Sequence, residues 1–250
     1  MLIFIDGGIP GVTPYVSGPH LWDKCLSLFD TETTTISVQG ETVDVMVDDL
    51  KRRIQQPVHL VGHDLGGLVA LALACEAPEH VRSVTAVASV AAAPTGDGVP
   101  NLTFAHPPMP RFSRESQRWA LERISYSHHH IDDDLLDACV AAGTESRISS
   151  SPLFLPSLME AKSRFYAICR DQGFPVPAQV IWGTHDPLGS FEQGLWLFRV
   201  IAQKQKAAHF HAINRSGALP FREEPQAFHQ IVSAFVDGLE PVTSPTSPAA

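Results

Sequence analysis

One aspartate occupies a position where a reactive side chain would be presented. Asp64 lies at the centre of a G-x-D-x-G turn at residues 62–66, between apolar stretches that predict a buried strand and a helix within 58–74. Such a sharp strand-to-helix turn needs both glycines, because a side chain at 62 or 66 would collide with the backbone. The turn therefore lifts the carboxylate of Asp64 clear of the sheet edge, where it could attack an electrophilic carbon.

Three further motifs accompany this turn in a fixed order along the chain. They are GGIPG at 7–11, WGTHD at 182–186 and GALPF at 217–221. Together with the turn they resemble the α/β-hydrolase superfamily. The aspartate narrows the resemblance to branches that attack with a carboxylate, such as epoxide hydrolases and haloalkane dehalogenases. The resemblance covers most of the chain and implies an α/β fold: a mostly parallel sheet with an inserted helical cap.

The resemblance also assigns catalytic roles by position. Asp64 would be the nucleophile, and Asp186 the acid that holds a histidine base. That histidine is expected at 218, where this chain has alanine, and alanine cannot transfer a proton. The backbone amides of Ile9 and Leu65 would form the oxyanion hole.

Two explanations for Ala218 remain open. A deliberate substitution of histidine would trap a substrate or a covalent intermediate, which fits the intact motif around it. Alternatively the histidine was lost naturally, with the base moved elsewhere or catalysis abandoned. His185 adjoins the acid and His63 adjoins the nucleophile, but their backbone positions aim them away from the same water.

Candidate substrate-binding residues lie near the nucleophile and in the expected cap. They are Gly8, His63, Tyr126 and Tyr166. Epoxide hydrolases use two cap tyrosines to hydrogen-bond the epoxide oxygen, whereas tyrosines on amphipathic helices also serve packing alone. A dehalogenase would favour Trp or Arg after the nucleophile, and Leu65 supplies neither.

Histidine clusters do not predict a metal site. The adjacent residues 128–130 cannot all face one ion. His209 and His211 share one face of a strand by their period of two, which could make a metal pair, but structural histidines are the favoured interpretation. We expect neither a metal nor a cofactor.

Composition excludes several partner classes. The 250 residues carry a formal net charge of −9 and 44% hydrophobic residues, which argues against a nucleic-acid surface. We see no apolar run long enough to cross a membrane. The four cysteines are scattered without a C-x-x-C pair, which favours reduced thiols and a cytoplasmic location.

The order of apolar stretches predicts the domain organisation. We expect a hydrolase core at 1–95 and 176–240, a helical cap at 96–175 and a disordered tail at 241–250. The expected elements include a first helix at 20–29, a strand at 84–92, and cap helices at 113–127, 131–142 and 155–172. Relative to the family, a leading strand pair is missing, which suggests a minimal core or a truncated start.

The leading hypothesis is a cofactor-free hydrolase of a small organic molecule. Asp64 would form an ester that water later hydrolyses, and with Ala218 the chain would stall at that ester. One alternative is a hydrolase of esters or of C–C bonds in ring-cleavage products, although that branch usually carries serine at 64. A second alternative is a non-catalytic small-molecule binder of the same fold. The sequence assigns no oligomeric state.

Overall fold

The computed structural model describes residues 1–9, 13–94, 107–145 and 151–239. Within them, six parallel strands form one sheet in the order β2-β1-β3-β4-β5-β6. The strands are β1 Leu2–Ile5, β2 Thr33–Ile36, β3 Val58–His63, β4 Val81–Val87, β5 Ala178–Gly183 and β6 Ala208–Ile213. The predicted α/β fold is therefore confirmed.

Alternation along the strands divides the core into two layers. Ile3 and Ile5 of β1 pack into one cluster, whereas Leu2 and Phe4 pack into the cluster on the opposite face. All four side chains are buried, because the central strands have helices on both sides.

The first layer of helices packs on the face of Ile3 and Ile5. It consists of α2 Val43–Arg53, α3 Leu65–Glu76, η2 Pro78–His80, α7 Phe154–Asp171 and α8 Phe191–Ala202. Helix α3 is buried nearly all round between the sheet and α2 and α7. Thr42 caps α2 by accepting a hydrogen bond from the amide of Val45.

The second layer covers the other face and is made of shorter elements apart from α10. It consists of η1 Pro19–Trp22, α1 Asp23–Leu26, α9 Pro220–Glu223 and α10 Pro225–Leu239. The first helix expected at 20–29 is thus two short turns, since the chain bends to bury Trp22 against Phe221 at a ring distance of 4.0 Å. The strand expected at 84–92 ends at Val87, because Ala88 has a positive φ of 42°.

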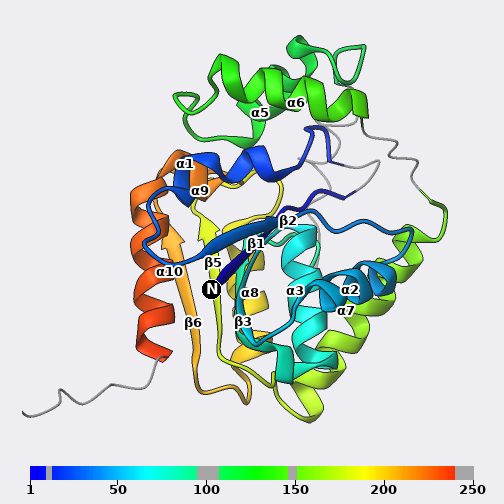
Figure 1. Cartoon of the computed structure of the whole chain (residues 1–250), viewed down its shortest axis with the longest axis vertical. Coiled ribbons are helices and arrows are strands. Elements are labelled where there is room, and N and C mark those ends of the chain that lie inside the picture. Colours follow the sequence, from blue (N-terminus) through cyan, green and yellow to red (C-terminus); the bar gives the residue numbers. More distant parts are fainter. Residues whose placement is uncertain (10–12, 95–106, 146–150, 240–250) are drawn as a thin grey trace, which may run out of the picture.

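Two helices lie over the carboxyl ends of the strands, α5 Arg114–Ile124 and α6 Asp133–Glu145 (Figure 1). Ser113 begins α5 by accepting from the amide of Ser116, as its sequence indicates. Helix α7, which the expected cap range includes, instead packs beside α2 and α3. We refer to α5 and α6 as the roof helices.

Some expectations are not addressed by the fold. The predicted disordered tail at 241–250 and the expected start of the cap at 96 lie outside the described residues. The domain limits stay a prediction. No helix in the described ranges combines the length and the apolar character that crossing a membrane requires.

Candidate active site

The turn after β3 has the strained geometry of a nucleophile elbow. Asp64 has φ 44° and ψ −109°, a conformation that non-glycine residues rarely adopt. A Cβ at Gly62 would lie 2.3 Å from the carbonyl oxygen of Gly66, and one at Gly66 would lie 2.4 Å from that of Ile5. Both glycines are therefore required, as the sequence indicates, and the neighbouring backbone holds Asp64 in its strained position.

The carboxyl group of Asp64 is buried and oriented. Its side chain Oδ1 accepts a hydrogen bond of 2.9 Å from the amide of Ala91, and only 4% of the residue is exposed. Burial raises the pKa of Asp64 to about 6, while the Ala91 amide and the ammonium group of Lys162 oppose that rise. Asp64 is therefore mostly ionised at pH 7, as attack on carbon requires.

The loop after β5 brings Asp186 to the same edge. Its Oδ1 accepts hydrogen bonds from the amides of Leu188 at 2.8 Å and Gly189 at 3.3 Å. Its Oδ2 is buried and has no hydrogen-bond partner among the residues that the structure describes. Burial raises the pKa of Asp186 to about 8 despite the two amides, and the charges of Asp64 and Glu223 add to the rise. Asp186 is therefore mostly protonated at pH 7.

Ala218 follows β6 and is held by its backbone. Its amide donates to the carbonyl oxygen of Ile124 at 2.8 Å, and its own carbonyl oxygen lies 3.0 Å from Nε2 of His63. Burial lowers the pKa of His63 to about 4, so this ring is neutral at pH 7. The structure thus uses His63 to fix the backbone at 218, whose methyl group offers no proton.

The acid Glu223 fastens the same corner to the roof helices. Its Oε1 accepts from the amide of Gly217 at 2.7 Å, and its Oε2 accepts from Tyr126 at 2.8 Å and Ser127 at 3.0 Å. A Cβ at Gly217 would lie 2.2 Å from the carbonyl oxygen of Ile124. The residue before Ala218 must therefore be glycine for α5 to end where it does.

The two expected oxyanion amides have different surroundings. The amide of Ile9 donates to the hydroxyl of Thr13 at 2.7 Å, so it already has an acceptor. Leu65 is the first residue of α3, and the first amides of a helix lack acceptors within the helix. The loop after β1 lies against this amide, since a Cβ at Gly7 would be 2.7 Å from it. Gly8 packs beside Ser17.

A family model described as the alpha/beta hydrolase family matches residues 19–231. The chain belongs to this family. The matched range of this α/β-hydrolase chain includes Asp64, Asp186 and Ala218, whose catalytic roles stay a prediction.

Relatives of this α/β-hydrolase chain include curated esterases. It is 24% identical over 203 residues to pimeloyl-[acyl-carrier protein] methyl ester esterases of Neisseria meningitidis serogroup A and serogroup C. That match covers 79% of this chain, and it covers 62% of the serogroup A protein and 76% of the serogroup C protein. The chain thus spans less than two thirds of the length of the first of these relatives.

Solved structures share its fold at low sequence identity. A meta-cleavage product hydrolase from Pseudomonas fluorescens IP01 is 19% identical, with a TM-score of 0.69 over 96% of this chain and 91% of that one. A serine hydrolase involved in carbazole degradation is 17% identical, with a TM-score of 0.68 over 94% and 90%. The specific resemblance to epoxide hydrolases is not addressed by these matches.

The two candidate tyrosines do not meet at the nucleophile of this α/β-hydrolase chain. Tyr126 is 44% exposed, and its ring lies 4.5 Å from that of His185. Tyr166 lies on α7 and donates its hydroxyl to the carbonyl oxygen of Ala92 at 2.6 Å. Tyr166 therefore supports the segment whose Ala91 amide holds Asp64, and its placement fits a packing role.

Sequence reasoning missed two residues near the carboxylates. Tyr15, in the loop after β1, is 4% exposed, and its hydroxyl has no hydrogen-bond partner within the described ranges of the chain. Burial, together with the negative charges of Asp64 and Asp186, raises the pKa of Tyr15 well above its ordinary value. No motif marks Tyr15. Lys162 carries a weak signal, because it is the fourth residue after Leu158 on the buried stripe of α7.

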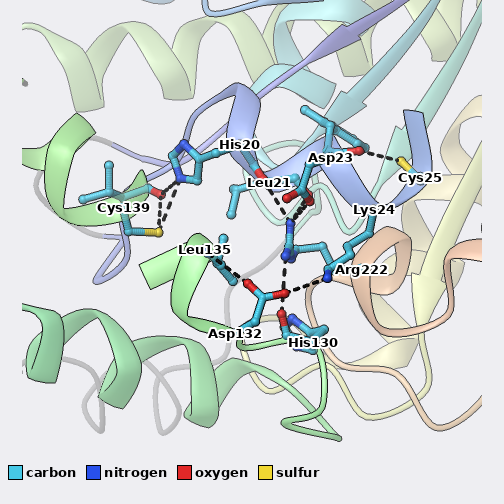
Figure 2. A network of polar contacts seen from close by, with 12 residues as sticks. His20, Leu21, Asp23, Lys24, Cys25, His130, Asp132, Leu135, Cys139 and Arg222 are labelled. Carbon is cyan, nitrogen blue, oxygen red and sulfur yellow. Dashed lines mark hydrogen bonds and ion pairs between the residues drawn. The ribbon is translucent and has the colours of Figure 1, made fainter. Parts of the chain in front are cut away.

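A buried arginine joins the second helical layer to the roof helices (Figure 2). Arg222 of α9 donates from Nη1 to the carbonyl oxygens of His20 at 3.0 Å and Leu21 at 3.1 Å, and it pairs with Asp23. Its Nη2 donates to the carbonyl oxygen of His130, between α5 and α6, at 3.3 Å. This guanidinium group therefore fixes η1 and the roof connection beside the GALPF motif.

The described residues contain no group of three or more His, Cys, Asp or Glu side chains arranged to hold a metal ion. His209 and His211 stack on β6 with ring centroids 6.3 Å apart. In the run 128–130, His130 is buried and lies 2.9 Å from the hydroxyl of Ser125. These histidines therefore have structural contacts in this α/β-hydrolase chain.

Proposed function

We propose that this chain is a cofactor-free hydrolase of a small organic substrate, with Asp64 as its nucleophile. Oδ2 of Asp64 makes no hydrogen bond within the described part of the chain, while Oδ1 is held by Ala91. Oδ2 attacks an electrophilic carbon. In an alkyl bromide the C–Br bond breaks and bromide departs with the electron pair; in an epoxide the C–O bond breaks, and the oxygen keeps the electron pair, stays attached to the product and takes a proton from water. The product is an ester of Asp64. The amide of Leu65 lies beside the reacting carboxylate and stabilises negative charge.

The observation that carries this proposal is the buried Oδ2 of Asp186 without a hydrogen-bond partner. Buried carboxylate oxygens are rarely left without donors, and a triad acid uses this oxygen to hold its histidine. In this proposal, position 218 is that of the expected histidine, and alanine there supplies no proton. Water attack on the ester therefore lacks its base, and the chain stalls at the covalent intermediate.

Mass spectrometry of the trapped ester tests this proposal. The unsubstituted chain is incubated with styrene oxide or 1-bromobutane, and the peptide that contains Asp64 gains the mass of the whole epoxide or, with 1-bromobutane, of a butyl group in place of a proton. Asp64→Asn removes the adduct, and the exposed Asp30→Asn, a matched control, keeps it. Ala218→His converts the stalled ester into turnover. An unmodified Asp64 peptide after long incubation, together with no turnover by Ala218→His, would overturn the proposal.

A second candidate is hydrolysis of an ester or of a C–C bond in a ring-cleavage product. The names of the esterase and meta-cleavage relatives favour it. Serine is the usual nucleophile of that branch, so the double variant Asp64→Ser/Ala218→His should hydrolyse p-nitrophenyl esters, whereas the unsubstituted chain should form no Asp64 adduct. If the double variant is active on esters and no Asp64 adduct forms in any variant, this second candidate replaces the first.

A non-catalytic binder remains the alternative from another class. It predicts that Ala218→His leaves ligand affinity unchanged and produces no turnover on any of these probes.

The hydrolase proposal also includes a helical cap at 96–175, of which α5 and α6 form the roof over the strand ends. It includes a cytoplasmic location as well, which is consistent with the four free cysteines.

A further inference from the structure

A cavity of about 490 Å³ lies between the edge strand β6 and helix α10, which are neighbours at one border of the sheet (Figure 1). Its lining includes His209 and His211 of β6 and, from α10, Gln230, Ile231, Phe235 and Leu239. This volume is typical of sites for small organic molecules. Two strands separate β6 from β3, which leads into the candidate active site, so the cavity belongs to a different part of the molecule.

The strand directs two imidazole rings to the cavity side. Phe210, which lies between the two histidines, packs on the opposite face against Phe191 of α8 at a ring distance of 5.4 Å. Because side chains alternate along a strand, His209 and His211 both face α10. Their ring centroids lie 6.3 Å apart with an interplanar angle of 14°, and the ring of His209 lies 5.6 Å from that of Phe235. The two imidazoles therefore form one polar end of a cavity whose other walls are mostly apolar.

The charge of this lining differs from that of the whole molecule. The chain has 27 acidic residues and a formal net charge of −9. Yet the lining residues within the described ranges include no Asp, Glu, Lys or Arg. The neighbouring strand β5 places Gln179 and Ile181 in register with the two histidines, and neither is ionisable. The two imidazoles are thus the only ionisable groups of the described lining, and an anion there meets no acidic side chain.

The surroundings of His211 couple its protonation to the occupant of the cavity. Partial burial lowers the pKa of His211, and the charge of His209 lowers it further. The ring of His211 is therefore mostly neutral at pH 7 when the cavity is empty. A bound anion would favour the protonated ring and raise this pKa, because an opposite charge nearby stabilises the imidazolium ion.

We infer that the cavity between β6 and α10 binds a small monocarboxylate with an apolar body. Each carboxylate oxygen accepts a hydrogen bond from one of the rings of His209 and His211. The body of the ligand packs against Ile231, Phe235 and Leu239, which removes apolar surface from water. This inference goes beyond the proposed hydrolase and uses no residue of the candidate active site.

A metal ion is the other occupant that a pair of histidines suggests. Metal sites in proteins usually have three or four protein ligands. The described residues offer no group of three or more His, Cys, Asp or Glu side chains that could hold an ion. The rings of His209 and His211 also stack nearly parallel, so their nitrogens do not point at one centre. A carboxylate, which has two separate acceptor oxygens, fits this pair better.

NMR titration of the full chain with 4-phenylbutyrate tests the inference, in buffer that contains EDTA. The imidazole C–H signals of His209 and His211 should shift on binding. The affinity should rise at least about fivefold from pH 8 to pH 6, because binding takes up a proton on an imidazole ring. The neutral analogue 4-phenyl-1-butanol should bind at least about fivefold more weakly at pH 6 and show no such dependence on pH.

Three variants locate the binding. The double variant His209→Asn/His211→Asn should lose the rise in affinity at pH 6. Ala234→Trp fills the cavity from the exposed side of α10 and keeps both histidines, so it should abolish binding. His229→Asn is the matched control, because His229 lies on α10 but stacks on Phe29 with ring centroids 4.8 Å apart.

Several results would overturn the inference. They are an affinity that does not change with pH, equal affinity for the carboxylate and the alcohol, and undiminished binding to Ala234→Trp. Signal shifts confined to the candidate active site would also overturn it. A shift of the two histidine signals by zinc chloride without EDTA, together with no response to 4-phenylbutyrate, would replace the carboxylate by a metal ion.

Discussion

The Asp64 corner and the Ala218 corner are both glycine-tight turns at strand ends, yet different parts of the molecule hold them. The elbow is braced by the sheet and its immediate neighbours: the amide of Asp64 donates to Val87, and its carbonyl oxygen accepts from Ser89. The turn at Ala218 is braced by the roof, through Ile124 and through Glu223. Asp64 is thus positioned by the core, whereas the backbone at Ala218 is held both by His63 of β3 and by Ile124 at the end of a roof helix.

This difference explains how one corner can lack its reactive group while its backbone stays in place. Ala218 makes its contacts through its amide and its carbonyl oxygen, with Ile124 and His63. Neither contact uses the side chain. The backbone at 218 therefore does not depend on which side chain it carries, and each corner can be perturbed separately.

The largest expected effect is on stability, from a methyl group added at each corner. Gly62→Ala and Gly217→Ala both place Cβ within 2.3 Å of a backbone oxygen, so each should cost about 3 kcal/mol of unfolding free energy. Gly62→Ala should act on the whole core. Gly217→Ala should also speed amide hydrogen exchange in α5, because its clash is with Ile124.

Denaturant unfolding and hydrogen exchange measure this pair, and Gly238→Ala is the matched control. A Cβ at Gly238 meets nothing within 4 Å, and its place in α10 predicts a stabilisation of about 0.5–1 kcal/mol. If the amides of α5 are equally protected from hydrogen exchange in Gly62→Ala and Gly217→Ala, the Ala218 corner is not held by the roof helices in a way that the Asp64 corner is not.

The second effect concerns the dependence of stability on pH. The folded-state pKa of Asp186 is about 8 against an ordinary 3.8, so the folded state binds this proton more tightly than the unfolded state. The contribution of Asp186 to stability is therefore fully present below pH about 4 and is lost as pH rises from about 4 to about 8. Asp186→Asn should remove that loss and stabilise the protein by about 2 kcal/mol or more at pH 8.5.

Asp64→Asn provides the comparison for Asp186→Asn. Its folded-state pKa of about 6 predicts a smaller gain that is complete at lower pH. Urea unfolding at pH 5 and at pH 8.5 measures both variants. A gain for Asp64→Asn as large as that for Asp186→Asn would contradict the assignment of the proton to Asp186.

The third effect probes the link between the Ala218 corner and the roof. Glu223→Gln loses the acceptor for at least one of three buried amides and should cost about 1–3 kcal/mol. Helix α5 should lose protection before the core does. The adjacent Glu224→Gln is the control. If the backbone amides of the core and of α5 lose protection from hydrogen exchange equally, Glu223 does not act through the roof.

The sequence predicts the corners better than the space between them. The glycine turns, Asp64 and the alanine at 218 follow from short local motifs, because each depends on backbone conformation within a few residues. Tyr15 and Lys162 reach the site from a loop and from the apolar stripe of α7, and only packing brings them there. The helix expected at 20–29 is observed as two short turns for a similar reason, because the packing of Trp22 outweighs the helical spacing of its apolar residues.

The smallest expected effect separates the charge environment of Asp64 from its position. Lys162 donates to the carbonyl oxygen of Ala93 at 2.7 Å and lowers the pKa of Asp64 through its charge. Lys162→Met should therefore raise that pKa, shift the acid limb of the alkylation rate to higher pH and slow alkylation about twofold at pH 7. The pH-independent rate should not change, because Ala91 still orients the carboxylate.

Arg164→Met is the matched control on the same helix, since Arg164 pairs with Asp44 and Glu160. An unmoved acid limb in Lys162→Met would mean that the Ala91 amide alone offsets the burial of Asp64. A lowered rate at every pH would mean that Lys162 acts by holding the 91–93 segment in place. The elbow would then depend on α7 for its geometry as the Ala218 corner depends on the roof, and the contrast between the two corners would be one of degree.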